Sequence, residues 1–253
     1  MKLTFLGTGT SQGVPVIACN CEVCKSKDKK DKRLRSSVMI NIDDKVIVID
    51  SGPDFRQQML RENVLKLDAL LLTHGHKDHV AGLDDVRAFN YLQRKAIDVY
   101  AREDVHEIIK NEFSYAFAVD KYPGVPEINL HIVENKQFEV AGIKILPIEV
   151  QHYKLKIFAY RIGDLTYITD ANKITEKELS KVYGSKILVI NALRKTPHIS
   201  HFNLQEALKI IDLISPDKAY ITHISHLMGL HKLVTKELPP NVELAYDGLK
   251  IEI

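Results

Sequence analysis

The chain has 253 residues, of which 45% are hydrophobic and 27% charged, so its length and composition are those of an ordinary globular protein. The formal net charge of +2, from 35 Lys and Arg against 33 Asp and Glu, gives no reason to expect a protein that coats nucleic acid. No apolar run approaches the roughly 20 residues that span a bilayer, and no signal peptide is expected, so we predict a cytoplasmic protein without membrane association.

The predicted elements of the first part of the chain are mostly strands that end in loops. A short strand over 2–6 runs into a glycine-rich turn at 7–13, and the charge-dense loop at 25–35 is predicted to be solvated. A hairpin follows over 38–50, and an apolar strand over 69–73 stops at a histidine cluster.

The remaining elements mix helices and strands. They are a helix over 103–118, strands over 128–134 and 137–150, a hairpin over 157–169, a helix over 173–182, strands over 186–191 and 219–222, a helix to about 214 opened by a capping box at 203–206, and a closing hairpin over 242–253. This order favours α/β layers with helices outside a mixed or sandwiched pair of sheets. We expect one domain over 1–253, with a metal-binding knuckle loop at about 19–35.

The only three cysteines of the chain, Cys19, Cys21 and Cys24, lie within six residues of one another. Three thiols cannot all pair internally, so a disulfide framework is not expected. Three thiolates this close can converge on one tetrahedral zinc ion if the backbone makes a tight knuckle, and the fourth ligand must then be a histidine. The alternative is that the clustered thiols are incidental.

The segment THGHKDH after the strand at 69–73 places four potential metal ligands, His74, His76, Asp78 and His79, within six residues. On a helix, side chains at positions i and i+2 point about 200° apart, whereas in extended chain they lie on the same side. His74 and His76 can therefore share a metal only in a loop that leaves a strand, and we expect Asp78 and His79 to be turned by the start of the next helix. Imidazole suits Zn, Mn or Fe, and a neighbouring carboxylate tolerates harder cations. The alternative is a run of surface histidines.

Three later predicted strands also end in a potential ligand, namely His152, Asp170 and His223. Singly, each is explained as well by a hydrogen-bonded polar residue at a strand edge. Together with the first cluster they make seven candidates, enough for two adjacent metals. Two metals roughly 3.5–4 Å apart are a recurrent device for hydrolysis by a bridging hydroxide.

These motifs, in this order and spacing, resemble the metallo-β-lactamase superfamily. More narrowly, the chain is similar to the PhnP-like phosphoribosyl cyclic phosphodiesterases of carbon–phosphorus lyase pathways. That resemblance covers nearly the full chain and rests on GTGTSQGVP, CNCEVC, VIVIDSG, LLTHGHKDHVAGL, HYKLKIFAY, YITD and ITHISH. It implies an αββα sandwich, in which two mixed β-sheets pack face to face with helices on the outside. It also implies a metal-dependent hydrolase, more narrowly a phosphoric diester hydrolase.

The resemblance also implies a role for individual residues. One metal would be held by His74, His76 and His152, the other by Asp78, His79 and His223, with Asp170 bridging the two. His226 would complete the structural zinc site, Asp50 would support the ligands from behind, and His201 would be the general acid, with Asp78 also in the catalytic set. The catalytic pair would be Mn²⁺ or Zn²⁺.

The expected substrate is a small cyclic ribosyl or nucleotide phosphodiester, with Thr8, Thr10 and Ser11 as candidate donors to phosphate oxygens. Simple strand-to-loop geometry explains that turn equally well. No long basic arm is visible, so long nucleic acids are not expected as partners, and a homodimer is implied by the resemblance. Four histidines match no motif and are expected on the surface or at helix caps: His106, His131, His198 and His231. His198 differs from the other three in that its loop is expected to border the site.

Other readings of the same motifs stay open. A related hydrolase could process RNA 3′ ends, thioesters or lactones, and proteins of pyrroloquinoline quinone biosynthesis combine a similar CxCxxC segment with this fold. A non-catalytic metal-binding scaffold would keep the metal ligands and leave His201 dispensable.

Overall fold

The computed structural model describes all 253 residues, and its strands form two sheets. The strands of the first sheet are β1 (Lys2–Gly7), β2 (Ser37–Ile42), β3 (Lys45–Ile49), β4 (Ala69–Leu71), β5 (Ile97–Ala101), β6 (Ile128–Ile132) and β15 (Lys250–Glu252). Their order across the sheet is β15-β1-β2-β3-β4-β5-β6. Pairing is antiparallel from β15 to β3 and parallel from β3 to β6, so the sheet is mixed.

The second sheet repeats this mixed arrangement. Its strands are β7 (Phe138–Val140), β8 (Ile143–His152), β9 (Leu155–Ile162), β10 (Leu165–Ile168), β11 (Lys173–Ile174), β12 (Ile187–Asn191), β13 (Lys218–Thr222) and β14 (Val242–Leu244). They run in the order β11-β8-β9-β10-β12-β13-β14, with β7 paired to β8. Pairing is antiparallel as far as β10 and parallel from β10 to β14.

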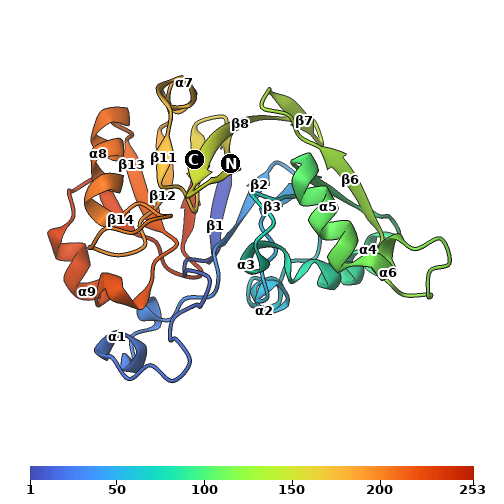
Figure 1. Cartoon of the computed structure of the whole chain (residues 1–253), viewed down its shortest axis with the longest axis horizontal. Helices are drawn as coiled ribbons and strands as arrows, with labels where there is room; N and C mark the ends of the chain where they lie inside the picture. Colours follow the sequence, from blue (N-terminus) through green and yellow to red (C-terminus); the bar gives the residue numbers. More distant parts are fainter.

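Helices cover the two outer faces. They are α1 (Glu22–Lys25), α2 (Phe55–Arg61), α3 (Lys77–Val80), α4 (Arg87–Gln93), α5 (Glu103–Glu112), α6 (Ser114–Phe117), α7 (Glu176–Leu179), α8 (Leu204–Ile214) and α9 (His231–Val234), with short 3₁₀ turns at Lys29–Asp31, Leu83–Val86, His226–Met228 and Thr235–Glu237. In Figure 1, α2, α4 and α5 lie on the first-sheet side and α8 and α9 on the other. The predicted αββα sandwich is confirmed. None of the helices is both long and apolar enough to cross a membrane.

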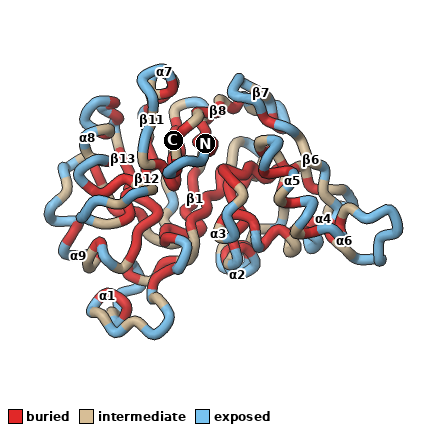
Figure 2. The backbone as a smooth tube through the Cα atoms, viewed as in Figure 1, coloured by how far each residue is buried: buried red, intermediate tan, exposed pale blue.

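Alternating side chains build a separate core on each side of the sheets. In β3, Ile47 and Ile49 point into the layer between the sheets, whereas Val48 packs against the helices of the first half. Because both faces of such strands are covered, their sequences are apolar without interruption. Figure 2 shows the result, with buried chain along the strands and exposed chain at the helices and loops of the rim.

The capping box predicted at the start of α8 is confirmed. The Asn203 side chain accepts a hydrogen bond from the Glu206 amide at 2.9 Å, and the Glu206 carboxylate accepts one from the Asn203 amide at 2.8 Å. Such a cap contributes about 1 kcal/mol. It fixes the start of the helix whose buried face, including Ala207 and Ile211, closes the second sheet.

The predicted closing hairpin over 242–253 is wrong. β14 pairs in parallel with β13 in the second sheet, whereas β15 pairs antiparallel with β1 in the first. The chain crosses between the sheets at Asp247, whose carboxylate accepts hydrogen bonds from the amides of Thr8 and Leu34 at 3.0 and 2.7 Å. The turn is therefore held by distant segments that local sequence does not reveal.

Three other predicted elements are subdivided in the structure. The strand at 137–150 is the β7–β8 hairpin, which turns at Ala141 and Gly142, both with positive φ. The helix at 173–182 shortens to α7 after the two-residue strand β11, and the helix at 103–118 is interrupted at Phe113. The elements α2, α4 and β5 were not predicted.

Two hydrogen bonds tie the sheets together beside the end of β4. The Phe158 amide donates to the Thr73 carbonyl at 3.0 Å, and the buried Tyr160 hydroxyl donates to the Leu72 carbonyl at 2.7 Å. Both acceptors lie just before His74, so these bonds set the position of the histidine segment relative to the second sheet.

Replacing Tyr160 by Phe removes one of these buried bonds while keeping the aromatic ring. We expect Tyr160→Phe to lower the free energy of unfolding by about 1–2 kcal/mol in denaturant titration. Tyr167→Phe is the matched control, because Tyr167 is equally buried but its hydroxyl has no hydrogen-bond partner. An equal loss of stability in both variants would contradict the role given to the Tyr160 hydroxyl.

Candidate metal centre

The structure brings all seven predicted ligands together where strands of both sheets end. Besides a group that joins His152 and Asp170 to His201, three groups of these ligands have donor atoms within 4.8 Å of one another: His74, His76 and His152; His74, His79 and Asp170; and Asp78, Asp170 and His223. All but His76 and Asp78 are buried. The loops after β4, β8, β10 and β13 supply these side chains, so the centre lies between the two sheets.

Left-handed backbone conformations set the direction of two ligand side chains, Asp170 and His223, and of the neighbouring Asp50. Asp50, Asp170 and His223, which follow β3, β10 and β13, have φ angles of 66°, 57° and 54°. Asp and His are among the residues that adopt this region more readily than most. Each such turn costs on the order of 1 kcal/mol or more and is retained where the surrounding structure imposes it.

The histidine segment follows the predicted path from strand to helix. His76 is extended, with φ −67° and ψ 149°, and α3 begins at the next residue. His74 Nε2 lies 3.0 Å from His76 Nδ1, so the two imidazoles do face one shared point. A Cβ at Gly75 between them would lie 2.4 Å from Ile108 Cδ1, so a larger residue there would displace the end of the Ile108 side chain.

Asp50 lies behind the ligands, where the resemblance placed it. This fully buried carboxylate accepts hydrogen bonds from the Thr73 amide at 2.8 Å and the Thr73 hydroxyl at 2.9 Å. It also accepts one from His79 Nδ1 at 2.7 Å. The bond to Nδ1 leaves Nε2 of His79 directed at the centre, which is how a carboxylate orients a ligating imidazole.

Burial and charge set the protonation of these groups. Burial alone would raise the pKa of Asp170, but His223 and His79 bring it well below its ordinary value. Burial lowers the pKa of His74 well below its usual range and that of His223 to about 4. For His79, burial opposes protonation, yet the charges of Asp170, Asp50 and Asp78 raise its pKa. Neutral imidazoles and ionised carboxylates are the forms that bind metal.

The donor atoms fit a divalent cation. His79 Nε2 lies 3.1 Å from carboxylate oxygens of both Asp78 and Asp170, yet it makes no hydrogen bond to either. His223 Nε2 is also buried without a partner. Buried polar atoms are nearly always satisfied, so convergent unpaired donors of this kind indicate a ligand. A mixed set suits both Zn²⁺, which imidazole binds well, and the harder Mn²⁺, which prefers carboxylate oxygens.

His201 reaches the same centre from the loop before α8. Its Nε2 lies 3.0 Å from Asp170 Oδ1, and its ring stacks at 5.0 Å from that of His223. His198, expected on the surface or at a helix cap, lies instead against His201, with their Nδ1 atoms 3.1 Å apart. The sequence carried no motif that would have identified this contact.

The first threonine of the glycine-rich turn, Thr8, points into the interior of the protein. Thr8 is fully buried, and its hydroxyl donates to Asp247 at 2.7 Å while accepting from the guanidinium of buried Arg33 at 2.8 Å. That hydroxyl is thus occupied and does not face a substrate. Thr10 is largely buried and Ser11 is exposed, and for these two the substrate contact stays a prediction.

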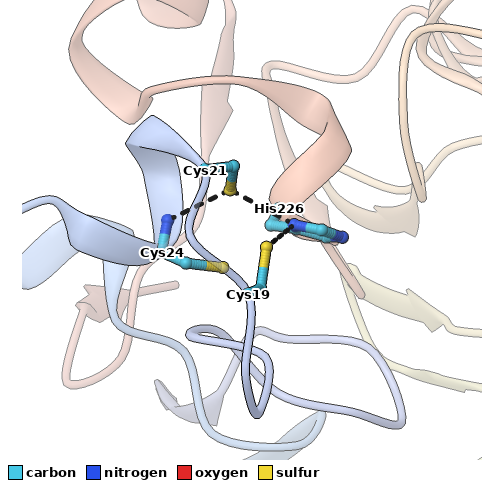
Figure 3. A group of neighbouring side chains, drawn as sticks. All are labelled: Cys19, Cys21, Cys24 and His226. Atoms are coloured by element: carbon cyan, nitrogen blue, oxygen red, sulfur yellow. Dashed lines mark hydrogen bonds between the residues drawn. The ribbon is translucent and has the colours of Figure 1, made fainter.

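The four residues predicted for structural zinc form a second cluster (Figure 3). Cys19 Sγ and Cys21 Sγ each lie 3.3 Å from His226 Nδ1, and all four donor atoms, with that of Cys24, fall within 4.8 Å of one another. Zinc bonds of ~2.3 Å to sulfur and ~2.0 Å to nitrogen put two such ligands about 3.5 Å apart across a tetrahedral ion. The Cys24 amide and His226 lower the pKa of Cys21 to about 6, which favours the thiolate that zinc requires.

The other histidines lie away from both clusters. His131 is partly exposed and paired with Asp98 at 2.9 Å. His106 and His231, expected on the surface or at helix caps, are both buried, and His231 is the first residue of α9.

Comparison with known proteins identifies the class. Residues 45–224, well over half of the chain, match the β-lactamase superfamily domain. The fold and the ligand set therefore define a member of the metallo-β-lactamase superfamily. Within it the chain belongs to the PhnP family. A diphosphatase of that family, known from its crystal structure, shares 40% sequence identity at a TM-score of 0.93 and covers 100% of this chain and 97% of its own.

Two further relatives show how widely this fold is used. The octanoyltransferase of Porphyromonas gingivalis is 39% identical over 253 residues, but the chain spans 51% of it, about half its length. The Zn²⁺-bound PqqB of Methylobacterium extorquens has a TM-score of 0.80 at 19% identity, with both chains covered completely. At that identity the likeness concerns the fold alone.

Proposed function

We propose that the chain is a dinuclear metal-dependent hydrolase of small phosphodiesters. The observation that carries the proposal is the shared carboxylate of Asp170, which belongs both to a ligand group with His74 and His79 and to one with Asp78 and His223. Two divalent metals held by these residues would lower the pKa of water, neutralise phosphoryl oxygens and orient in-line attack. Mn²⁺ or Zn²⁺ would be held by the seven ligands, and a structural Zn²⁺ by the cysteine cluster.

Other residues of the chain orient the metal ligands and provide a proton donor for the leaving group. Asp50 holds His79 in one orientation, and the hydrogen bonds between the sheets hold His74 opposite His152. His201, beside Asp170 and 12% exposed at its side chain, is placed to donate a proton from Nε2 to the departing oxygen. Imidazole is the side chain that enzymes use most often for proton transfer at neutral pH.

Hydrolysis of a diphosphate is the second candidate. It is favoured by the similarity to the PhnP-family diphosphatase, which extends over the whole chain at 40% identity. Both bonds join phosphorus to a bridging oxygen, so the same ligands serve either reaction. Octanoyl transfer has less support, because the chain corresponds to only about half of that relative.

The first prediction concerns the metal ligands. His74→Ala removes a buried donor common to two of the ligand groups. With metal-replete protein and bis(p-nitrophenyl) phosphate, we expect hydrolysis to fall by about a thousandfold or more, since several kcal/mol of charge stabilisation depend on the metals. His131→Ala is the control, because that histidine lies on β6, where it pairs with Asp98 and stacks on Tyr100. Activity that survives in His74→Ala would refute the two-metal mechanism.

The second prediction concerns the cysteine cluster. We expect about three metal equivalents per chain, of which Cys21→Ser loses one zinc, because oxygen replaces a thiolate ligand. Metal analysis after dialysis measures the loss, and hydrolysis of bis(p-nitrophenyl) phosphate by the same sample reports on the other site. An unchanged metal content in Cys21→Ser would count against a structural zinc.

The third prediction concerns the proposed acid. His201→Ala should slow diphenyl phosphate, whose leaving phenolate is basic, by about 100-fold or more. Its effect on bis(p-nitrophenyl) phosphate should be much smaller, since p-nitrophenolate leaves without a proton. Steady-state rates on both esters measure the difference. Equal losses on the two esters would mean that His201 is not the acid.

A further inference from the structure

The loop that carries His201 is fixed at both its base and its tip. At the base, the Leu193 amide donates to the Phe202 carbonyl at 2.9 Å. At the tip, the Asn172 side-chain amide donates to the Ile199 carbonyl at 2.9 Å, and His152 Nδ1 donates to the Ser200 carbonyl at 2.9 Å. These bonds hold the backbone of the loop independently of His198.

His198 contributes to the loop through one ring nitrogen. Its Nδ1 lies 3.1 Å from Nδ1 of His201, 3.3 Å from the Ser200 amide nitrogen and 3.2 Å from the Ser200 hydroxyl. The backbone N–H of Ser200 can only donate, so Nδ1 of His198 is an acceptor. In the contact between the two imidazoles, Nδ1 of His201 is therefore the donor.

The imidazole of His201 is thus held from two ends. Nε2 faces the Asp170 carboxylate, and Nδ1 is held by His198 and by the Ser200 hydroxyl at 2.9 Å. The rings of His152 and His223 lie 4.8 and 5.0 Å away and limit rotation sideways. His198 and the Ser200 hydroxyl are thus the contacts that fix the direction in which Nδ1, and hence Nε2 across the ring, points.

We propose that His198 is a positioning residue for the reaction, which keeps His201 Nε2 aimed at the oxygen that leaves. This inference rests on the proposed function for its kinetic consequence, but its structural content does not. His198 touches His201 and not Asp170, and it is half-buried at the edge of the centre.

The geometry also specifies which substitutions should preserve the role. The side-chain amide of Asn places a polar atom close to where His has Nδ1, whereas that of Gln reaches the place of Nε2. We therefore expect His198→Asn to keep the contact with His201, and His198→Gln and His198→Ala to lose it.

The kinetic test measures the three His198 variants, His201→Ala and the His131→Ala control on diphenyl phosphate and bis(p-nitrophenyl) phosphate. His198→Ala and His198→Gln should lose about tenfold or more in kcat on diphenyl phosphate, with little change on the nitrophenyl ester. His198→Asn should stay within a few-fold of the original on both. Equal losses on the two esters, or no rescue by Asn, would overturn the proposal.

A structural readout keeps the inference separate from the proposed function. Crystal structures of His198→Ala and His198→Asn should show His201 displaced or in two rotamers in the first and unmoved in the second. An unmoved His201 in His198→Ala overturns the positioning role. If the unsubstituted protein hydrolysed neither ester while His201 moved as expected, the proposed function would fail and the positioning role would stand.

Discussion

The burial of one carboxylate governs the centre of this molecule. Asp170 is 2% exposed, and a buried charge costs several kcal/mol unless opposite charge or donors surround it. Asp170 accepts hydrogen bonds from His201 Nε2 at 3.0 Å and from the Thr169 hydroxyl at 2.9 Å, and ring nitrogens of His79 and His223 lie 3.1 Å from it. These imidazoles come from both sheets and from the loop before α8, so Asp170 is satisfied only when the sandwich is complete. Folding and cation binding are therefore linked at this residue.

Precision at the centre comes from the backbone as much as from the side chains. Residues with positive φ follow β3, β10 and β13, and each turns a polar side chain towards the same point. The bonds from Phe158 and Tyr160 to the end of β4 fix one sheet against the other. Rigid strands thus carry the unfavourable turns, as expected where strain is confined to a functional site.

The sequence predicted those features that depend on residues close to one another in the chain. The spacing of His74 and His76 required a strand followed by a loop, and Asn203 with Glu206 marked the start of α8. The resemblance supplied His226, some 200 residues from its cysteines. What sequence did not reveal depends on distant partners, as when Asp247 carries the chain from one sheet to the other or His198 meets His201. In each case the fold, and not the local sequence, determines which residues come into contact.

The two ends of the chain meet at the edge of the first sheet. The Met1 amino group donates to the Ile253 carbonyl at 3.0 Å, and the Ile253 amide donates back at 2.8 Å (Figure 1). Because β1 runs in the same direction as β3, whose far end leads to Asp50, this junction lies opposite the metal ligands. A polypeptide attached at either end would emerge at one place, away from the substrate.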